Sequence, residues 1–205
     1  TVNTDFAQVE VDEQQVNLTR FPLFFPEKRE FFLEGAGVYE FGGGTGSGNV
    51  PALFYSRQIG ISQGRPVPID AGGRVTGKVG KFSVGRLNVQ TDDQLSRGVP
   101  STNFSVLRVR RDILRRSNIG VLYTRRSESL ARNGSNDAYG VDAAFGFFTA
   151  LNITTYLAQT RSPGRSDDDT RYRTNLNYNA DRYGVQMERL AVGSNFNPEI
   201  GFVRR

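Results

Sequence analysis

The chain contains no histidine, no cysteine and a single methionine among its 205 residues. Without histidine there is no imidazole to act as a general base, and without cysteine there is no thiol nucleophile and no disulfide. The usual nitrogen and sulfur ligands of zinc and haem iron are missing as well. We therefore expect no metal and no cofactor, and the absence of cysteine leans towards the bacterial cell surface.

A dense run of basic residues is also missing, although Lys and Arg number 26 against 21 Asp and Glu, for a formal charge of +5. The arginines are scattered through strand-like segments among acidic residues, and the base-stacking motifs of nucleic-acid-binding domains are absent. We therefore expect no nucleic-acid partner. A positive balance also suits lipid headgroups.

No stretch approaches the roughly 18 to 20 apolar residues that a membrane-spanning helix needs. The strands of a membrane β-barrel need only about 9 to 11 residues with apolar side chains on one face, a signal that hydropathy averages hide. The negative mean hydropathy of −0.45 is therefore compatible with a barrel.

Neither end of the chain carries a recognisable signal. Thr1 leads directly into the polar, strand-like stretch 5–11, with no basic and apolar leader before it, and another strand-like stretch stops at Arg205. We expect both ends to be internal or processed, so that the chain is part of a longer protein.

What the chain does contain is two-residue alternation, clearest between Arg171 and Asn179. Tyrosine, threonine and leucine at even positions alternate with arginine and asparagine at odd positions. Because successive side chains of a strand point to opposite faces, this pattern predicts a strand with one apolar and one polar face. A turn at 180–182 and a second alternating stretch, 183–188, complete a predicted hairpin.

The same unit recurs and gives about four predicted hairpins in succession. Their strands are expected at 75–79 and 82–89, 105–111 and 119–126, 138–147 and 151–157, and 171–179 and 183–188. Short turns at 80–81, 112–118, 148–150 and 180–182 alternate with longer polar connections at 91–102, 127–137 and 161–170.

This alternation is typical of outer-membrane barrels, whose turns are short on the periplasmic side and longer outside. The sequence therefore predicts an all-β fold: an antiparallel up-and-down meander that forms part of an outer-membrane-type β-barrel in contact with lipid. Small residues on the polar faces, such as Gly120 and Gly140, suit a crowded wall. The alternative is a soluble β-sandwich with its apolar faces packed together.

In a barrel the polar strand faces would line a lumen, and tyrosines at strand ends would lie at the membrane interface. The predicted lumen-lining residues, which would favour anionic or sugar-like solutes, are Arg74, Lys78, Arg86, Arg108, Arg110, Arg171, Arg173 and Glu188. The predicted interface girdle consists of Tyr139, Tyr172, Tyr178 and Tyr183.

Residues 1–65 differ in residue composition and pattern from the predicted meander of residues 66–205. We expect them to form a plug or a barrel entry. The run 21–35 mixes phenylalanines, prolines and charges, so its charged side chains would be partly desolvated and must pair. This predicts a structural ion-pair cluster of Glu27, Lys28, Arg29, Glu30 and Glu34. A sharper alternative makes Glu30 and Glu34 the acid and base of a glycoside hydrolase, although nothing in the spacing fixes the required carboxyl separation.

Other motifs in the chain are weak. The glycine-rich run 42–48 lacks the Gly-Lys-Ser/Thr ending of a phosphate loop and is predicted to be a flexible loop. The three aspartates 167–169 lack the spacing of a calcium-binding loop and are predicted to be a solvated acidic tip. No serine has a histidine base, so we assign no nucleophile.

Four ordered blocks, 5–10, 21–35, 54–60 and 195–202, carry a resemblance to a known family. The chain resembles an uncharacterised bacterial family, a domain of unknown function, in which a family-9-type carbohydrate-binding module precedes a C-terminal outer-membrane β-barrel domain. The chain is similar to the first part of that barrel domain, without the binding module or the later strands. The resemblance implies location and architecture but no established activity.

Taken together, these features favour a non-enzymatic pore, transport or surface-anchoring component that is linked to carbohydrate binding. The expected partners are outer-membrane lipid and a carbohydrate or other anionic solute. The alternative function is a cell-surface glycan-processing protein that the barrel only anchors.

Overall fold

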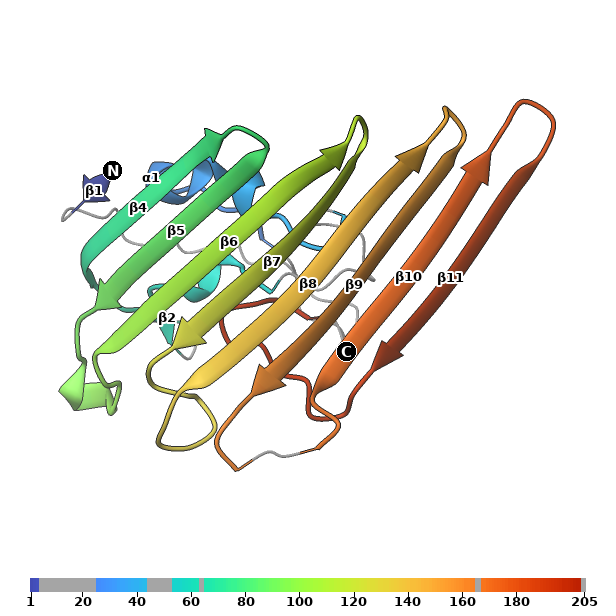
Figure 1. The fold of residues 1–205 in the computed structure, drawn as a ribbon. Coiled ribbons are helices and arrows are strands. Elements are labelled where there is room, and N and C mark those ends of the chain that lie inside the picture. The colour runs from blue at the N-terminus through green and yellow to red at the C-terminus, as the bar shows by residue number, and fades with distance from the viewer. Residues whose placement is uncertain (4–24, 44–52, 63–64, 165–166, 204–205) are drawn as a thin grey trace.

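The computed structural model describes residues 1–3, 25–43, 53–62, 65–164 and 167–203. Its main feature is a nine-stranded antiparallel sheet in the order β1-β4-β5-β6-β7-β8-β9-β10-β11 (Figure 1). Apart from the short β1, the strands follow one another in sequence, which confirms the predicted all-β, up-and-down meander. The strands are β1 (Val2–Asn3), β4 (Ile69–Val79), β5 (Phe82–Thr91), β6 (Thr102–Leu114), β7 (Ser117–Arg126), β8 (Asn136–Phe147), β9 (Leu151–Arg161), β10 (Thr170–Asn179) and β11 (Gly184–Val192).

The connections alternate in length as the sequence predicts. Turns of two to four residues join β4 to β5, β6 to β7, β8 to β9 and β10 to β11, and Figure 1 shows all four at the same end of the sheet. The described parts of the longer connections, 92–101, 127–135, 162–164 and 167–169, lie at the opposite end. The β6–β7 turn is shorter than predicted, because Asp112 still pairs with Asn118 and Leu114 with Ser117 beyond a bulge.

The two faces of the sheet have different surroundings. The face that carries Val121, Val141 and Leu157, here called the open face, exposes these side chains by 48%, 55% and 55%. The opposite face, called the covered face, buries Leu122 and Ala158 completely or nearly so. Both faces alternate along every strand, as the two-residue period requires.

Two covering segments pack on the covered face. The N-terminal covering segment, residues 25–43 and 53–62, contains α1 (Glu30–Leu33), η1 (Ala36–Tyr39), η2 (Ser56–Gln58) and β2 (Ile61–Ser62), which pairs with β3 (Arg65–Pro66). The C-terminal covering segment, residues 193–203, is irregular rather than the strand expected near the end of the chain. In Figure 1 both segments lie behind the sheet.

The hydrophobic core lies between the covering segments and the sheet. Phe31, Phe32, Tyr39, Phe41, Leu53, Ile59, Phe196 and Ile200 from the covering segments pack with Leu87, Val89, Phe104, Val106, Leu122, Ala138, Tyr156 and Ala158 from the sheet. The burial of these side chains, each contributing on the order of 1.5 to 3 kcal/mol when large, is the main force that holds the segments in place.

The sheet is open in the described part of the chain, with β1 at one edge and β11 at the other. The only other sheet among the described residues has two strands, so the two large packed sheets of the alternative sandwich are not found there. None of the described helices has the length and apolar character needed to cross a membrane. The strand-like stretch expected at 5–11 and most of the glycine-rich run 42–48 lie outside the described residues.

Candidate functional site on the covered face

Among the described residues, Glu27, Arg29 and Glu34 take part in two separate ion pairs, and the five residues of the predicted cluster are not seen as one network. In the first, Glu27 accepts hydrogen bonds from Arg29 Nε and Nη2 at 2.9 and 2.8 Å and from Ser56 Oγ at 2.6 Å. Arg29, only 7% exposed, also donates to the carbonyls of Ser56 and Ile59 and stacks over Phe32 at 4.2 Å. Lys28 and Glu30, by contrast, are exposed.

The electrostatics of Glu27 follow from these contacts. Burial alone raises the pKa of this carboxyl, but the hydrogen bonds from Arg29 and Ser56 and the charge of Arg29 outweigh it and lower the pKa to about 2. Glu27 is therefore ionised across the physiological range. Its role is to neutralise Arg29 where the two runs 25–33 and 55–60 meet.

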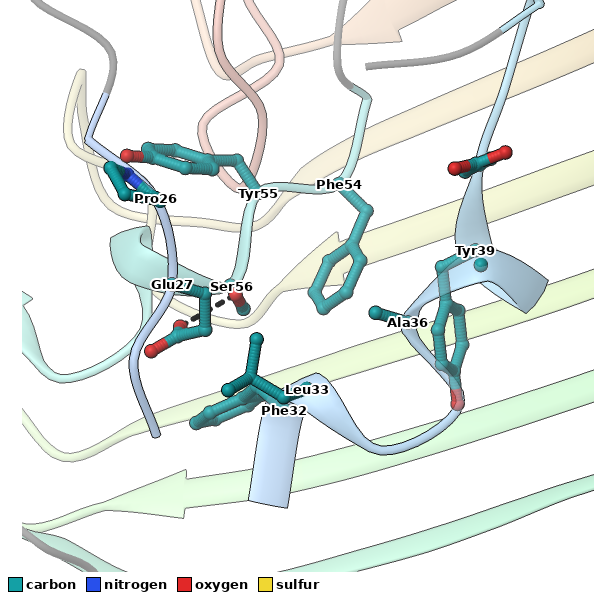
Figure 2. Close-up of a pocket in the computed structure, with 11 residues that line it drawn as sticks. Pro26, Glu27, Phe32, Leu33, Ala36, Tyr39, Phe54, Tyr55 and Ser56 are labelled. Atoms are coloured by element: carbon teal, nitrogen blue, oxygen red, sulfur yellow. Dashed lines mark hydrogen bonds between the residues drawn. The ribbon is translucent and has the colours of Figure 1, made fainter. Parts of the chain in front are cut away.

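A cavity of about 280 Å³ lies beside this pair. Figure 2 shows Phe54, Leu33 and Ala36 around it, with the Glu27–Ser56 hydrogen bond at one side. The remaining lining comes from Pro26, Phe32, Gly37, Tyr39, Glu40 and Tyr55. Burial raises the pKa of Tyr39 to about 12, so its phenol stays protonated. The cavity is a mainly apolar pocket with acidic groups at its margin.

The second ion pair joins the N-terminal covering segment to the sheet. Arg74 on β4, 4% exposed, pairs with the Glu34 carboxylate and donates to the carbonyls of Phe31 in α1 and of Glu34 just after it. Its guanidinium lies 5.4 Å from the ring centre of Phe31. The arginine thus caps the carbonyl end of a four-residue helix, where unpaired carbonyls otherwise remain.

A third, deeper pair lies near the middle of the sheet. Arg108 on β6 donates through Nη1 and Nη2 to Asp142 on β8 at 2.6 and 2.9 Å, and the two side chains are 1% and 8% exposed. The Asp142 carboxylate also accepts the backbone N–H of Gly42 at 3.0 Å. One buried carboxylate therefore ties two strands and the N-terminal covering segment together.

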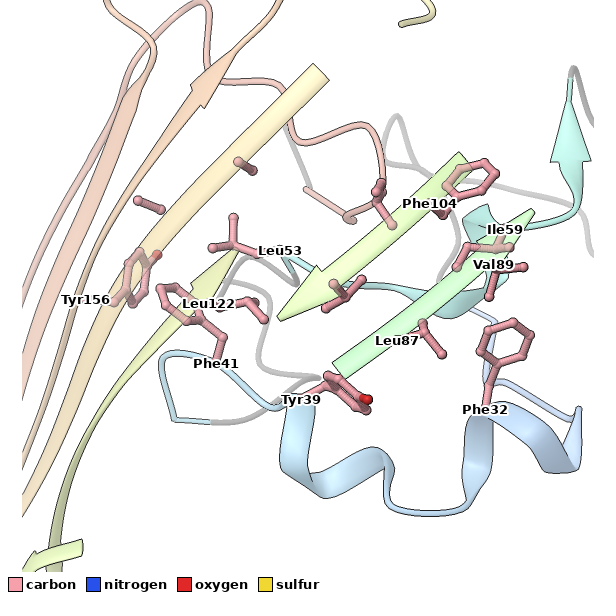
Figure 3. Packing of buried hydrophobic residues seen from close by; sticks show 14 of the residues in the cluster. Phe32, Tyr39, Phe41, Leu53, Ile59, Leu87, Val89, Phe104, Leu122 and Tyr156 are labelled. Carbon is pink, nitrogen blue, oxygen red and sulfur yellow. The ribbon is translucent and has the colours of Figure 1, made fainter. Parts of the chain in front are cut away.

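Two glycines make room for this arrangement. A Cβ at Gly120 on β7 would lie 2.7 Å from Arg108 Nη1, and a Cβ at Gly140 on β8 would lie 2.5 Å from both Leu53 and Phe41. Figure 3 shows Phe41 beside Leu122 and Tyr156, and its ring centre lies 5.6 Å from that of Tyr156. The small residues of the polar strand faces thus serve close approach by other side chains.

The C-terminal covering segment is held by a buried polar group that the sequence reasoning did not single out. Glu199, 6% exposed, accepts hydrogen bonds from Ser129 Oγ and the Leu130 N–H at 2.7 and 2.8 Å and lies 3.9 Å from Arg126. Asn136 accepts the Glu199 N–H and donates to the Asn197 carbonyl. The sequence does contain an indication of this role, since Glu199 is a single acidic residue among Phe196, Pro198 and Ile200.

The covering segments also contact each other. The Tyr55 N–H donates to the Ile200 carbonyl at 2.8 Å, and the rings of Tyr55 and Phe202 meet edge to face at 5.5 Å. Blocks 54–60 and 195–202, far apart in sequence and both part of the family resemblance, therefore form one packed unit.

Seven of the eight predicted lumen-lining residues share the covered face. Arg74 and Arg108 are buried against the N-terminal covering segment, and Arg171 is likewise buried, with 3% exposure. Nearer the short turns, Lys78 pairs with Asp112 and Arg173 with Glu188, at 2.8 and 2.9 Å. Arg110 lies in the same cross-strand row as Lys78.

Arg86 is the exception, because it pairs with Val75 and Leu107 in the register and lies on the open face. Grouping it with the other seven is therefore corrected. On β5 the apolar side chains Leu87 and Val89 belong to the covered face, because the N-terminal covering segment packs on them.

The four predicted girdle tyrosines do not lie on the covered face. Tyr139, Tyr172 and Tyr178 belong to the open face, and Tyr183 lies in the β10–β11 turn with 74% exposure.

Two aspartates of the predicted acidic tip, residues 167–169, accept hydrogen bonds from the protein. Asp168 accepts the N–H of Ser194 at 2.7 Å, and Asp169 accepts from the side chain of Gln159. Residues 165 and 166 beside it lie outside the described residues.

The two carboxyls of the catalytic alternative, Glu30 and Glu34, line one surface pocket together with Thr1, Asn3, Phe31 and Leu33. Glu34 is tied to Arg74, and Glu30 is an exposed residue of the first turn of α1. Among the described residues no three Asp or Glu side chains are grouped in a way that could hold a metal ion. What the site does chemically is neutralise and bury charge between the sheet and the covering segments.

The fold and site define a class: an all-β protein with an open meander sheet, one face of which is covered by segments from both ends of the chain. Residues 1–72 match the model of a family described as Domain of unknown function (DUF5916). The match includes the N-terminal covering segment and the first residues of β4. No curated protein and no solved structure matches the chain.

Proposed function

We propose that the chain is part of the wall of a bacterial outer-membrane β-barrel, with the open face towards lipid and the covered face towards the lumen. The covering segments then act as a plug that fills this part of the lumen. In this proposal the protein is a non-enzymatic pore, transport or surface-anchoring component.

The observation that carries the proposal is the apolar band on the open face. Soluble monomers rarely expose a continuous apolar patch of more than a few hundred Å². Here aliphatic and aromatic side chains from neighbouring strands form cross-strand rows, with no described segment over them. One row contains Val109, Val121, Val141, Leu157 and Tyr172, and another contains Ile153, Leu176 and Met187. The row between them is mixed and consists of Arg111, Ile119, Ala143, Thr155, Thr174 and Arg189.

The charge distribution supports the same assignment. Of the carboxylates on β6 to β11, Asp112, Asp142 and Glu188 lie on the covered face, where each pairs with a basic residue, and Asp137 lies on the open face in the row next to the long connections. A wall between lipid and water favours carboxylates on the water side, because a charge that faces the hydrocarbon is costly. The long connections, at one end, would then face outwards from the cell.

In this proposal the solute is specified only by its chemical class. Near the short turns the covered face carries Arg173, Glu188, Asn175 and Asn177, a hydrogen-bonding surface suited to anionic or sugar-like molecules. The link to carbohydrate binding rests on the family resemblance. The glycan-processing alternative predicts polysaccharide turnover that falls in Glu30→Gln and Glu34→Gln variants, and unchanged turnover removes it.

The proposal is tested by fractionation of the full-length natural protein. It should stay with washed membranes and enter the detergent phase on phase separation, and recovery from the aqueous phase would contradict it. Reconstituted protein should conduct ions with a charge preference that weakens in Arg173→Ser. A complete absence of conductance would leave the anchoring role and exclude the pore.

A further inference from the structure

We propose that a basic and aromatic group on the open face, near the long connections, binds the phosphate groups of membrane lipids. The group consists of Tyr123 and Arg125 on β7, Asp137 and Tyr139 on β8, and Arg161 on β9. This inference rests on the proposed function, because it requires the open face to meet lipid.

The register orders these side chains by depth. Arg125, Asp137 and Arg161 form one cross-strand row next to the long connections. The adjoining row contains Tyr123 and Tyr139, and the row after that contains Val121, Val141 and Leu157. Charged, aromatic and aliphatic rows therefore follow one another, as headgroup, interface and hydrocarbon do in a bilayer leaflet.

The contacts within the group leave positive charge available. Asp137, with only 13% of its side chain exposed, accepts hydrogen bonds from Tyr123 Oη at 2.6 Å and from Ser135 Oγ at 2.9 Å. Arg125 lies 3.9 Å from this carboxylate and remains 53% exposed. This single carboxylate stands against two arginines, Arg125 and Arg161, so the group keeps a net positive charge.

Arg161 is exposed and forms no ion pair with any described residue. Its guanidinium lies 5.6 Å from the ring centre of Tyr139, which itself stands 5.4 Å from Tyr123. The planar donors of Arg125 and Arg161 flank Asp137 on adjacent strands, about 10 Å apart by strand spacing. Such a spacing lets two arginines engage one phosphorylated headgroup or two neighbouring ones.

The wider open face has the same charge bias. Its strand residues from β5 to β11 include five arginines, Arg86, Arg111, Arg125, Arg161 and Arg189, and one carboxylate, Asp137. The acidic partners of a membrane protein's basic residues can be lipids, and arginine near an anionic leaflet is attracted to it. The observations therefore favour an anionic lipid over a protein partner.

The test uses the full-length protein in detergent micelles, with native mass spectrometry to count bound lipid during titration with dioleoyl phosphatidic acid. The variant Arg125→Gln/Arg161→Gln removes the two charges of the group. The control Arg111→Gln/Arg189→Gln removes two arginines of the same face that also stack on rings, Phe82 and Tyr172. The inference predicts that the first variant weakens binding by about ten-fold or more, given the attraction of each arginine to anionic lipid, and that the control stays within about two-fold.

Three results would overturn the inference: equal losses in both variants, no loss in the first, or wild-type binding of diacylglycerol as strong as that of phosphatidic acid. Competition by inorganic phosphate as effective as that of the lipid would likewise exclude a lipid site. Insertion into phosphatidylcholine vesicles is measured in parallel. A chain that inserts without binding phosphatidic acid contradicts only this inference, whereas a chain that does not insert contradicts the proposed function as well.

Discussion

Arg108 and Asp142 form a two-point ion pair that passes over Gly120 of the strand between them, so that β6 and β8 are tied although they are not neighbours. The same carboxylate holds Gly42 of the N-terminal covering segment. The pair thus links the integrity of the sheet to the seating of the segment that covers it.

Asp142→Asn should be strongly destabilising, because it leaves the Arg108 guanidinium buried without its counter-charge. Breaking a buried pair in this way costs about 3 to 5 kcal/mol. Asp112→Asn, which breaks the exposed and solvent-screened pair with Lys78, is the matched control and should change stability far less. Urea unfolding in detergent, followed by tyrosine fluorescence, measures both, and equal losses would show that Asp142 has no special role.

Gly140→Ala should loosen the N-terminal covering segment. The added Cβ would lie 2.5 Å from Leu53 and from Phe41, so these side chains must move, at a cost of about 1 to 3 kcal/mol. Gly77→Ala on β4 has no atom within 4 Å of the new Cβ and should change stability by no more than about 0.5 kcal/mol. The expected readout is faster proteolysis within the N-terminal covering segment of Gly140→Ala alone. Unchanged cleavage there would contradict the proposed packing.

Acid should weaken the attachment of residues 25–33 to η2. Since the folded pKa of Glu27 is about 2, below its ordinary value of 4.5, its contribution is fully present above pH 4.5 and is lost as the pH falls to about 2. The stability difference between wild type and Glu27→Gln should therefore shrink across this window. Ser56→Ala, which removes one donor to Glu27, should shift the loss to higher pH. A difference that stays constant with pH would refute the assignment.

A charge placed in the apolar band should impair membrane insertion. Val141→Arg lies between Val121 and Leu157 and should cost about 2 to 4 kcal/mol if the position lies near the bilayer midplane. Ser105→Arg, on the same face but in the polar row near the long connections, is the control and should insert normally. The fraction folded into phosphatidylcholine vesicles distinguishes them, and equal insertion of both variants would argue against a lipid-facing band.

Much of the sheet could be predicted because strand alternation and turn composition are local. The stretch 171–179 shows its two faces in nine consecutive residues, and the turn at 180–182 follows directly. The faces of β5 were harder to assign, because the N-terminal covering segment makes part of its covered face apolar. Strand β5 has no single polar side, because Val84 lies on the open face and Leu87 and Val89 lie on the covered face. Arg86 was assigned to the wrong face for this reason.

The pairing of the charged residues could not be read from the sequence. Gly42 and Asp142 are separated by 100 positions and Glu34 and Arg74 by 40, and no local rule specifies such partners. Proximity in sequence instead suggested one cluster from Glu27 to Glu34. Sequence reasoning did indicate that charges among phenylalanines must be paired, and that part is seen in Arg29 and Glu27.

The most direct test of the account uses the absence of tryptophan from the chain, which makes single-tryptophan variants clean reporters. Leu176 and Asn177 are neighbours on β10, the first on the open face beside Ile153 and Met187 and the second on the covered face. In vesicles of brominated phosphatidylcholine, Leu176→Trp should be strongly quenched by the lipid and protected from aqueous acrylamide, and Asn177→Trp should show the reverse. Equal quenching of the two, or no quenching of Leu176→Trp by brominated lipid, would contradict a wall with lipid on one side and water on the other.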